Sequence, residues 1–114
     1  MFFLTVAGSL SQTATLQQEK RATAIALEQQ GSLAQAEAAW RDLLSIRPSD
    51  AEAFAHLGLL EARQEHYKEA IALYRKALTI NPAMPGMRLN LGLSQFKDGE
   101  LKEAIQTFTT LLKN

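Results

Sequence analysis

The chain has 114 residues, of which 46% are hydrophobic and 21% are charged, and this is the composition of one ordinary globular domain. Its twelve basic and twelve acidic residues cancel, which argues against non-specific binding to nucleic acid or to anionic membranes. The absence of cysteine excludes disulfides, thiolate metal sites and cysteine nucleophiles. No apolar run reaches the roughly 18 residues that a membrane-spanning helix needs.

Residues 1–16 differ in composition from the rest of the chain. They carry no charge, and an apolar run at Phe2–Leu10 is followed by small and hydroxyl residues. The pattern is typical of a secretory signal, with Ser9 and Ser11 at the small-residue positions before a cleavage site, although no Lys or Arg precedes the run. The segment is therefore either a signal-peptide remnant or an N-terminal extension. We expect an exported or periplasmic protein in the first case and a cytoplasmic one otherwise.

The remainder of the chain repeats with a period of 34 residues. The copies are 17–50, 51–84 and 85–114, and in each an alanine is followed four residues later by an aromatic residue. These pairs are Ala36 and Trp40, Ala70 and Tyr74, and Ala104 and Phe108. A period of this length indicates a stacked array of small supersecondary units, which use their surfaces for binding.

Each copy is expected to form two helices. In the second copy, apolar residues spaced by three and four predict helices over about 51–64 and 67–79. Gly99 marks the corresponding turn of the third copy, because glycine accepts a positive φ. Pro48 and Pro82 end the second helices of the first two copies, since proline has no N–H and restricts the residue before it. The sequence thus predicts six helices around one continuous core.

The small and aromatic columns are interpreted as packing positions and not as a cofactor site. If the two helices of a copy pack antiparallel, Ala70 faces Gly58 or its neighbours, and Tyr74 fills the gap beside Phe54 and Leu57. Alternating small and large side chains across an interface fill it at native density.

These residues resemble the signature of the tetratricopeptide repeat family, most clearly in the second copy. The matching residues there are Phe54 (where the family favours Trp), Leu57, Gly58, Ala70, Tyr74, Ala77 and Pro82. The departures are Lys20, Thr23, Glu61, Arg88 and Gln95. The resemblance covers residues 17–114. It implies an all-α fold, a right-handed superhelical array of three helix-turn-helix repeats, or α-solenoid.

In the resembled fold, the first helix of each repeat lines a concave groove. The groove positions combine an apolar stripe with cations and hydrogen-bonding side chains, and we take eight of them as candidate partner-binding residues. They are Arg21, Ile25, His56, Leu59, Arg63, Asn90, Leu93 and Lys97. Such a mixture suits an extended peptide with apolar anchors and a carboxylate. The alternative is that Leu59 and Leu93 bridge adjacent repeats and are largely buried.

Some members of the resembled family clamp the terminal carboxylate of chaperones with two asparagines and several basic residues. Here Asn90 is the one asparagine at the required sixth position, while Ala22 and His56 occupy it in the other copies. The second position of the middle copy is the acidic Glu52. The sequence therefore predicts that the chaperone clamp is absent.

Catalysis has little support in the sequence. His56 has no second histidine at metal-binding spacing, and His66 falls in a turn. Ser45 and Ser94 lack a recognisable base and acid, and no Gly-rich loop follows a strand. We expect no enzyme activity, no metal and no cofactor.

The last expected helix carries an apolar face with no further helix after it in the sequence. Its residues Leu101, Ile105, Leu111 and Leu112 are either exposed or covered by another chain. Alternatively, Gln106, Thr107, Thr110 and Lys113 make the outer face polar enough to serve as a cap. The leading hypothesis is a protein-interaction module that binds a protein or peptide partner in the groove, as an adaptor or assembly factor. The alternative is a structural unit that forms a homo-oligomer through this helix.

Overall fold

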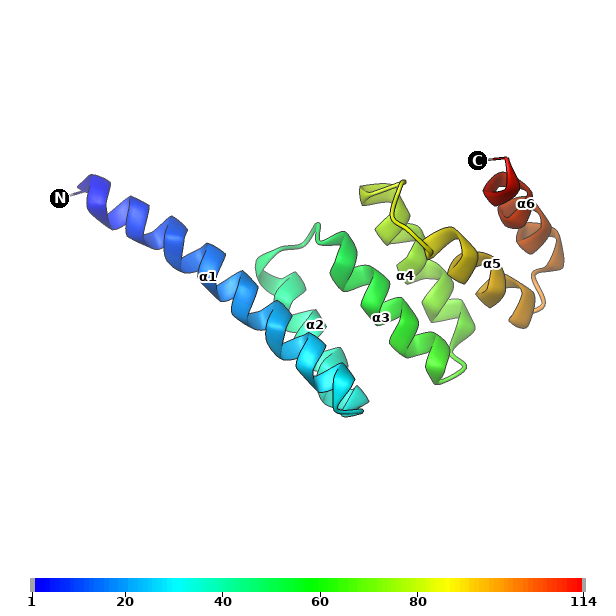
Figure 1. The fold of residues 1–114 in the computed structure, drawn as a ribbon, viewed down its shortest axis with the longest axis horizontal. Coiled ribbons are helices and arrows are strands. Elements are labelled where there is room, and N and C mark those ends of the chain that lie inside the picture. The colour runs from blue at the N-terminus through cyan, green and yellow to red at the C-terminus, as the bar shows by residue number, and fades with distance from the viewer. Residues whose placement is uncertain (1, 114) are drawn as a thin grey trace. The chain divides into compact units, whose positions relative to one another are not determined.

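The structure is a computed structural model that describes the backbone of residues 2–113 and the side chains of residues 11–113. Six helices follow one another along the chain (Figure 1). They are α1 (Phe2–Gln29), α2 (Leu33–Ile46), α3 (Ala51–Arg63), α4 (Tyr67–Ile80), α5 (Met87–Lys97) and α6 (Leu101–Leu112). No strand occurs within the described range, so the predicted all-α architecture is confirmed there.

The contacts divide the chain into two compact units, residues 1–48 and residues 49–114. The division falls at the break between the first and second expected copies. Each unit is described by itself below.

The first unit is a hairpin of α1 and α2, joined by a turn in which Gly31 has a φ of +78°. Trp40 and Leu43 are fully buried in this unit, and Lys20 of α1 pairs with Asp42 of α2. Helix α1 continues without a break through residue 17, where the first copy was expected to begin (Figure 1). The side chains of residues 1–10, on which the signal-peptide hypothesis rests, lie outside the described residues.

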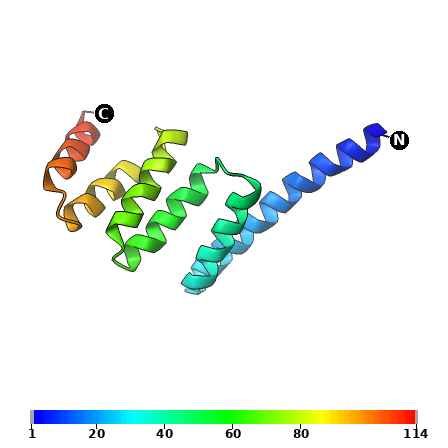
Figure 2. The ribbon, with the colours of Figure 1, turned by 180° about the vertical axis from the view of Figure 1, so that it is seen from behind.

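The second unit contains α3 to α6, and its consecutive helices run in alternating directions (Figure 2). Helix α3 begins where the sequence predicts, because the buried carboxylate of Asp50 accepts a hydrogen bond of 2.9 Å from the N–H of Ala53. The turn to α4 places Glu65 at a φ of +64°, and Gly99 stands at +85° in the turn to α6. Glutamate thus occupies a backbone conformation that glycine tolerates better.

In each hairpin of this unit, an aromatic ring on the second helix packs against a glycine on the first. The ring of Tyr74 lies directly on Gly58, where a Cβ atom would stand 2.6 Å from a ring carbon. The ring of Phe108 lies on Gly92 in the same way. The aromatic ring itself needs the space that glycine leaves, because it crosses the helix pair at that point.

Two polar residues take the places of apolar signature residues and are satisfied locally. Glu61 is buried, and its Oε2 lies 2.8 Å from Nδ1 of His66 in the following turn. Gln95 is buried as well, with its amide 2.6 Å from the hydroxyl of Thr107 on α6. A buried polar group is tolerated when it has such a partner.

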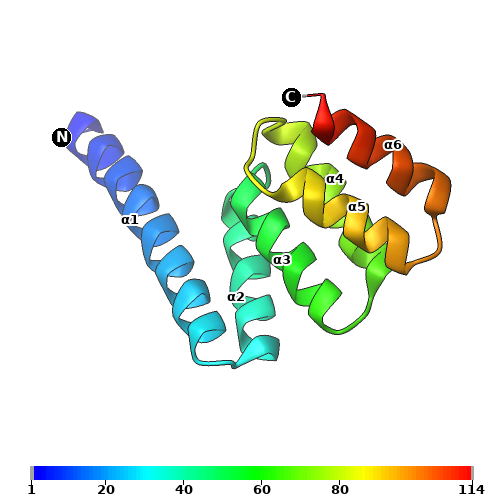
Figure 3. The same ribbon diagram turned by 45° about the vertical axis from the view of Figure 1, so that its right-hand side comes forward.

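Helix α5 covers the α3–α4 hairpin and completes the core of the second unit. Met87 and Leu91 of α5 are buried in one cluster with Ile71, Tyr74 and Leu78 of α4. Figure 3 shows α5 lying against α4, with α6 on its other side. Within the described residues of this unit, no further helix lies on the outer side of α6.

Candidate functional site

A surface hollow of about 230 Å³ opens between the first helices of the two hairpins in the second unit. Its walls combine apolar, cationic and hydrogen-bonding side chains from three helices. The lining residues are Leu59, Ala62 and Arg63 of α3, Tyr67 and Tyr74 of α4, and Asn90, Leu93, Ser94 and Lys97 of α5. We call this the α3–α5 hollow.

Helical spacing explains why these side chains converge. Leu59 and Arg63 are four residues apart on α3, and Asn90, Leu93 and Lys97 follow one another at three and four on α5. Residues at these spacings share one face of a helix. Because α5 packs on α4 and contacts α3, the two faces border the same hollow.

The apolar floor of the hollow is part core and part surface. Leu59 is half-buried and packs against the core cluster, whereas Leu93 keeps 44% of its surface exposed. The burial that we considered as an alternative for both leucines therefore describes Leu59 in part and does not describe Leu93. Leu93 leaves an apolar contact surface that a ligand can cover.

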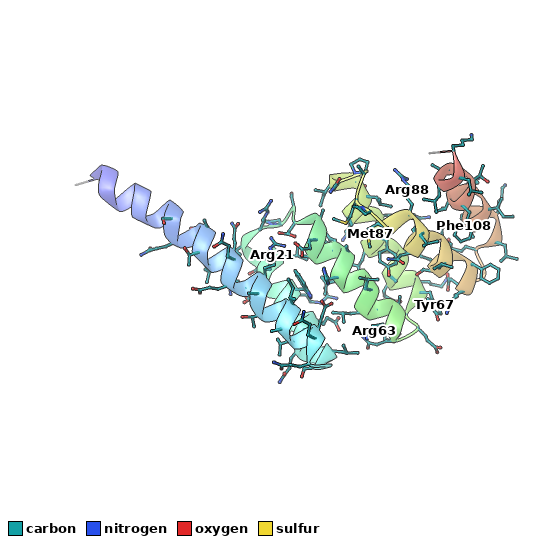
Figure 4. All side chains as sticks on the ribbon, viewed as in Figure 1. Arg21, Arg63, Tyr67, Met87, Arg88 and Phe108 are labelled. Carbon is teal, nitrogen blue, oxygen red and sulfur yellow. The ribbon has the colours of Figure 1, made fainter. Side chains whose placement is uncertain are left out.

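Two cations stand at the end of the hollow formed by the last turns of α3 and α5. Arg63 is exposed, and Figure 4 shows it at the same end of the unit as Tyr67. Lys97 places its Nζ 5.8 Å from the centre of the Tyr67 ring, within the range of a cation–π contact. Lys97 is also exposed, so its charge is available to an anion.

Tyr74 is a buried residue at the edge of the hollow. Burial raises the pKa of Tyr74 to about 12, because the charged phenolate loses its solvation there, and a hydrogen bond with Ser94 opposes this in part. The phenol is therefore neutral at ordinary pH. Asn90 and Ser94 add neutral hydrogen-bonding groups on the α5 wall.

The structure brings together five of the eight candidate residues: Leu59, Arg63, Asn90, Leu93 and Lys97. Three others stand elsewhere. His56 lies on α3 outside the hollow lining, with its Nε2 3.8 Å from Oε1 of Glu52. Arg21 and Ile25 are half-buried residues of α1 in the first unit.

The sequence analysis missed Tyr67, Tyr74 and Ser94 as residues of the hollow. Tyr74 was assigned to the core alone, but a ring that fills the core can also show one edge at its surface. Tyr67 is the first residue of α4, and it reaches the hollow because of the turn before it, which periodicity does not encode. Ser94 follows the groove position of Leu93 by one residue, and this adjacency was the available signal.

Two kinds of site are absent from the part of the chain that the structure describes. No three His, Asp or Glu side chains there gather into a metal-binding group. Among the same residues, no helix has the length and apolar character needed to cross a bilayer.

Two family models, both described as tetratricopeptide repeat, match residues 21–85 and residues 61–114. None of the curated proteins compared gives a significant match in sequence.

Solved structures resemble the chain over most of its length. The crystal structure of MamA protein has a TM-score of 0.74 and 23% identity, over 79% of this chain and 49% of that chain. The N-terminal domain of stress-induced protein-1 (STI-1) from C. elegans has a TM-score of 0.78 and 14% identity, over 89% and 85% of the two chains. The second TPR of Spaghetti (RPAP3), bound to the HSP90 peptide SRMEEVD, has a TM-score of 0.74 and 19% identity, over 86% and 96%.

At these identities the likeness establishes the fold, and it confirms the predicted all-α helical repeat of the solenoid class. The chain spans about half the length of the MamA chain that it matches.

Proposed function

Because this chain belongs to the tetratricopeptide repeat family, we propose that it is a protein-interaction module whose α3–α5 hollow binds an extended peptide segment. The bound segment carries an apolar side chain that covers Leu93 and a carboxylate that meets Arg63 and Lys97. In the cell, this activity corresponds to an adaptor or assembly role, and it involves no catalytic step and no cofactor.

The observation that carries the proposal is the convergence of an exposed leucine with two cations in one hollow. Contact with Leu93 supplies affinity by removing apolar surface from water. Arg63 and Lys97 select among partners, because a wrongly charged segment loses the electrostatic attraction and its dissociation is faster. The neutral amide of Asn90 can bond the main chain of an extended peptide.

The Spaghetti repeat was solved with an HSP90 peptide, so binding of a peptide is compatible with this fold. For the present chain we propose a segment of a different class. Ala22 and His56 occupy sixth positions at which a chaperone clamp would need its second asparagine. Glu52, in the first turn of α3, opposes a carboxylate at that end of the helix, whereas Arg63 and Lys97 line the hollow at its other end.

The test is selection of peptides with free carboxyl termini from a displayed library on the intact protein, followed by titration of the selected peptide. The double variant Arg63→Glu and Lys97→Glu is expected to raise Kd at least about tenfold, and to reduce the dependence of Kd on salt. Folding is expected to be nearly unchanged, because exposed charges contribute little to stability. The matched control is Lys102→Glu, which makes the same kind of charge change on α6 outside the hollow. Equal affinity of the double variant and the control would show that the hollow is not the binding surface.

The alternative function, a homo-oligomer formed through α6, rests on the exposure of Leu101, Ile105 and Leu112. It predicts that the mass measured by sedimentation rises with concentration. A module that acts through the hollow keeps one mass over the same range.

A further inference from the structure

The outer side of the α5–α6 hairpin is an apolar surface that nothing in the described chain covers. A hollow of about 390 Å³ lies on it, lined by Phe96, Leu101, Ala104, Ile105 and Phe108. Leu112 continues this surface along α6 with 86% of its area exposed. We call these six residues the end face. Isolated exposed leucines are ordinary on protein surfaces, but a contiguous set of this kind marks an interaction site.

The chain contains a covered version of the same face. With the 34-residue period, Ala104, Ile105, Phe108 and Leu112 correspond to Ala70, Ile71, Tyr74 and Leu78 of α4. In the α3–α4 hairpin these residues are buried under α5. Ile71 is 3% exposed and Ile105 is 65% exposed, although both are isoleucines at the same point of the repeat. The two isoleucines differ in exposure because a helix covers Ile71 and no helix covers Ile105, and not because the residues of the two faces differ.

Helix α5 therefore shows what kind of element fits the end face. The α5 residues that meet the α4 face are Met87, Leu91, Ser94 and Asp98: two lie in the core cluster, one bonds Tyr74, and one pairs with Lys68. Their spacing is i, i+4, i+7 and i+11, which is a single helix face. The pair of Lys68 Nζ and Asp98 Oδ2 spans 3.4 Å.

Two positions decide how a helix that fits the end face should differ from α5. Phe108 lacks the hydroxyl that Tyr74 directs at Ser94, so the residue at i+7 of a covering helix has no hydrogen bond to make and is favoured to be apolar. Lys102 stands where α4 has Lys68, so an acidic residue at i+11 keeps its cationic partner.

We propose that the end face binds an amphipathic helix of a partner protein, with apolar residues at i, i+4 and i+7 and an acidic residue at i+11. A second copy of this chain has no exposed helix with the full pattern. Helix α6 carries apolar Leu101, Ile105 and Phe108 at i, i+4 and i+7, but its residue at i+11 is Leu112 and not an acid. At the positions equivalent to Met87 and Leu91, α1 carries Glu19 and Thr23. The corresponding residues of α3, Ala53 and Leu57, are already fully buried.

The probe for this surface is a fluorescent peptide that copies residues 85–100, with Ser94→Leu. A hydrocarbon staple replaces Leu89 and Leu93, which lie on the opposite side of the helix from the i, i+4, i+7 and i+11 face, and holds the peptide helical. Fluorescence anisotropy with the full chain measures its Kd. We expect saturable binding, and weaker binding of the same peptide with serine kept at position 94.

Variants of the protein locate the binding. Ile105→Asp and Leu112→Asp change exposed residues, so thermal unfolding by circular dichroism is expected to match the wild type, while each raises Kd at least about tenfold. The double variant Arg63→Glu and Lys97→Glu, in the α3–α5 hollow, is expected to leave this Kd unchanged. The comparison therefore tests binding at the end face independently of binding in the α3–α5 hollow.

Charge exchange tests the acidic position. The peptide with Asp98→Lys is expected to bind a few-fold more weakly at low salt, and the protein variant Lys102→Glu to restore the loss. Absence of binding at millimolar peptide, or equal Kd for wild type and Ile105→Asp, would overturn the proposal. So would a mass that doubles with protein concentration and returns to the monomer value in Ile105→Asp, because the occupant would then be a second copy.

Discussion

The α3–α4 and α5–α6 hairpins are built from the same residue columns and differ in what covers them. In each hairpin, an aromatic ring of the second helix packs against a glycine of the first: Tyr74 against Gly58, and Phe108 against Gly92. Tyr74 is nevertheless 1% exposed, whereas Phe108 is only half-buried, because α5 covers the first ring and the end face leaves one side of the second open. Contacts inside a hairpin are thus set by its own sequence, and the burial of its outer face is set by the neighbouring helix.

The substitution expected to distinguish the two hairpins most strongly is replacement of the aromatic ring by alanine, measured as the loss in free energy of unfolding. Tyr74→Ala is expected to lower the free energy of unfolding by about 3–5 kcal/mol, because it empties a fully packed site. Phe108→Ala is expected to cost about 1–2 kcal/mol, since solvent already reaches that ring. Urea denaturation of both variants gives the comparison. Equal losses would mean that the end face is covered in solution.

Replacing Gly58 on α3 or Gly92 on α5 by alanine tests the same difference between the covered ring and the partly exposed ring. A Cβ atom at Gly58 meets the Tyr74 ring at less than 3.0 Å, and the core cluster prevents the ring from moving. Gly58→Ala is therefore expected to destabilise by about 2–3 kcal/mol. At Gly92 the Phe108 ring can turn outward into the hollow, and the expected cost is about 1 kcal/mol. A larger loss for Gly92→Ala in urea denaturation would contradict the openness of the second hairpin.

High pH distinguishes the two rings, because Phe108 has no ionisable group. The pKa of Tyr74 is raised to about 12 by burial from an ordinary value of 10.0. A raised pKa in the folded state means that stability is complete below pH 10 and is lost as the pH rises from 10 to 12. The loss is about 2–3 kcal/mol over this window.

The measurement is the difference in unfolding free energy between wild type and Tyr74→Phe as a function of pH. This difference removes the titration of lysines, which both proteins share. A constant difference from pH 9 to pH 12 would show that the phenol is not desolvated by α5.

The smallest expected effect concerns the turns. Glu65 holds a positive φ in the first hairpin, where Gly99 does so in the second. Glu65→Gly is expected to stabilise the protein by roughly 0.5–1 kcal/mol, because glycine relieves the left-handed conformation at some entropic cost. Thermal unfolding would show the gain as a higher Tm. A lower Tm would indicate that the Glu65 side chain makes a stabilising contact.

Periodicity was sufficient to predict the helices of the second unit, because each is amphipathic and each ends at a proline or a turn. The expected helices 51–64 and 67–79 agree with α3 and α4 to within one residue at each end. Periodicity was not sufficient for Phe108, which shares a column with Tyr74 but lacks a covering helix. A column describes a residue's place in its own repeat, and burial also depends on the next repeat.

The sequence predicts those residues of the candidate site whose position depends only on helical spacing. Leu59, Arg63, Asn90, Leu93 and Lys97 converge as helical spacing requires, while their role in binding stays a prediction. Tyr67 was missed because the path of a turn brings it to the hollow. Glu61 and His66 show the same limit. The contact between their side chains depends on how the chain leaves α3, and no spacing rule encodes it.

The match between the covered and uncovered faces has a consequence for how such a chain can change its length. A barrel closes on itself and fixes its number of strands, but each hairpin here ends in a surface that can accept the same kind of hairpin again. Tandem duplication of residues 51–84 would place a copy of α3, with Ala53 and Leu57 toward α4, where α5 now begins. An insertion of 34 residues keeps every contact in register, whereas most other lengths displace the glycines from the rings. Growth of the molecule by gene duplication therefore proceeds in whole hairpins.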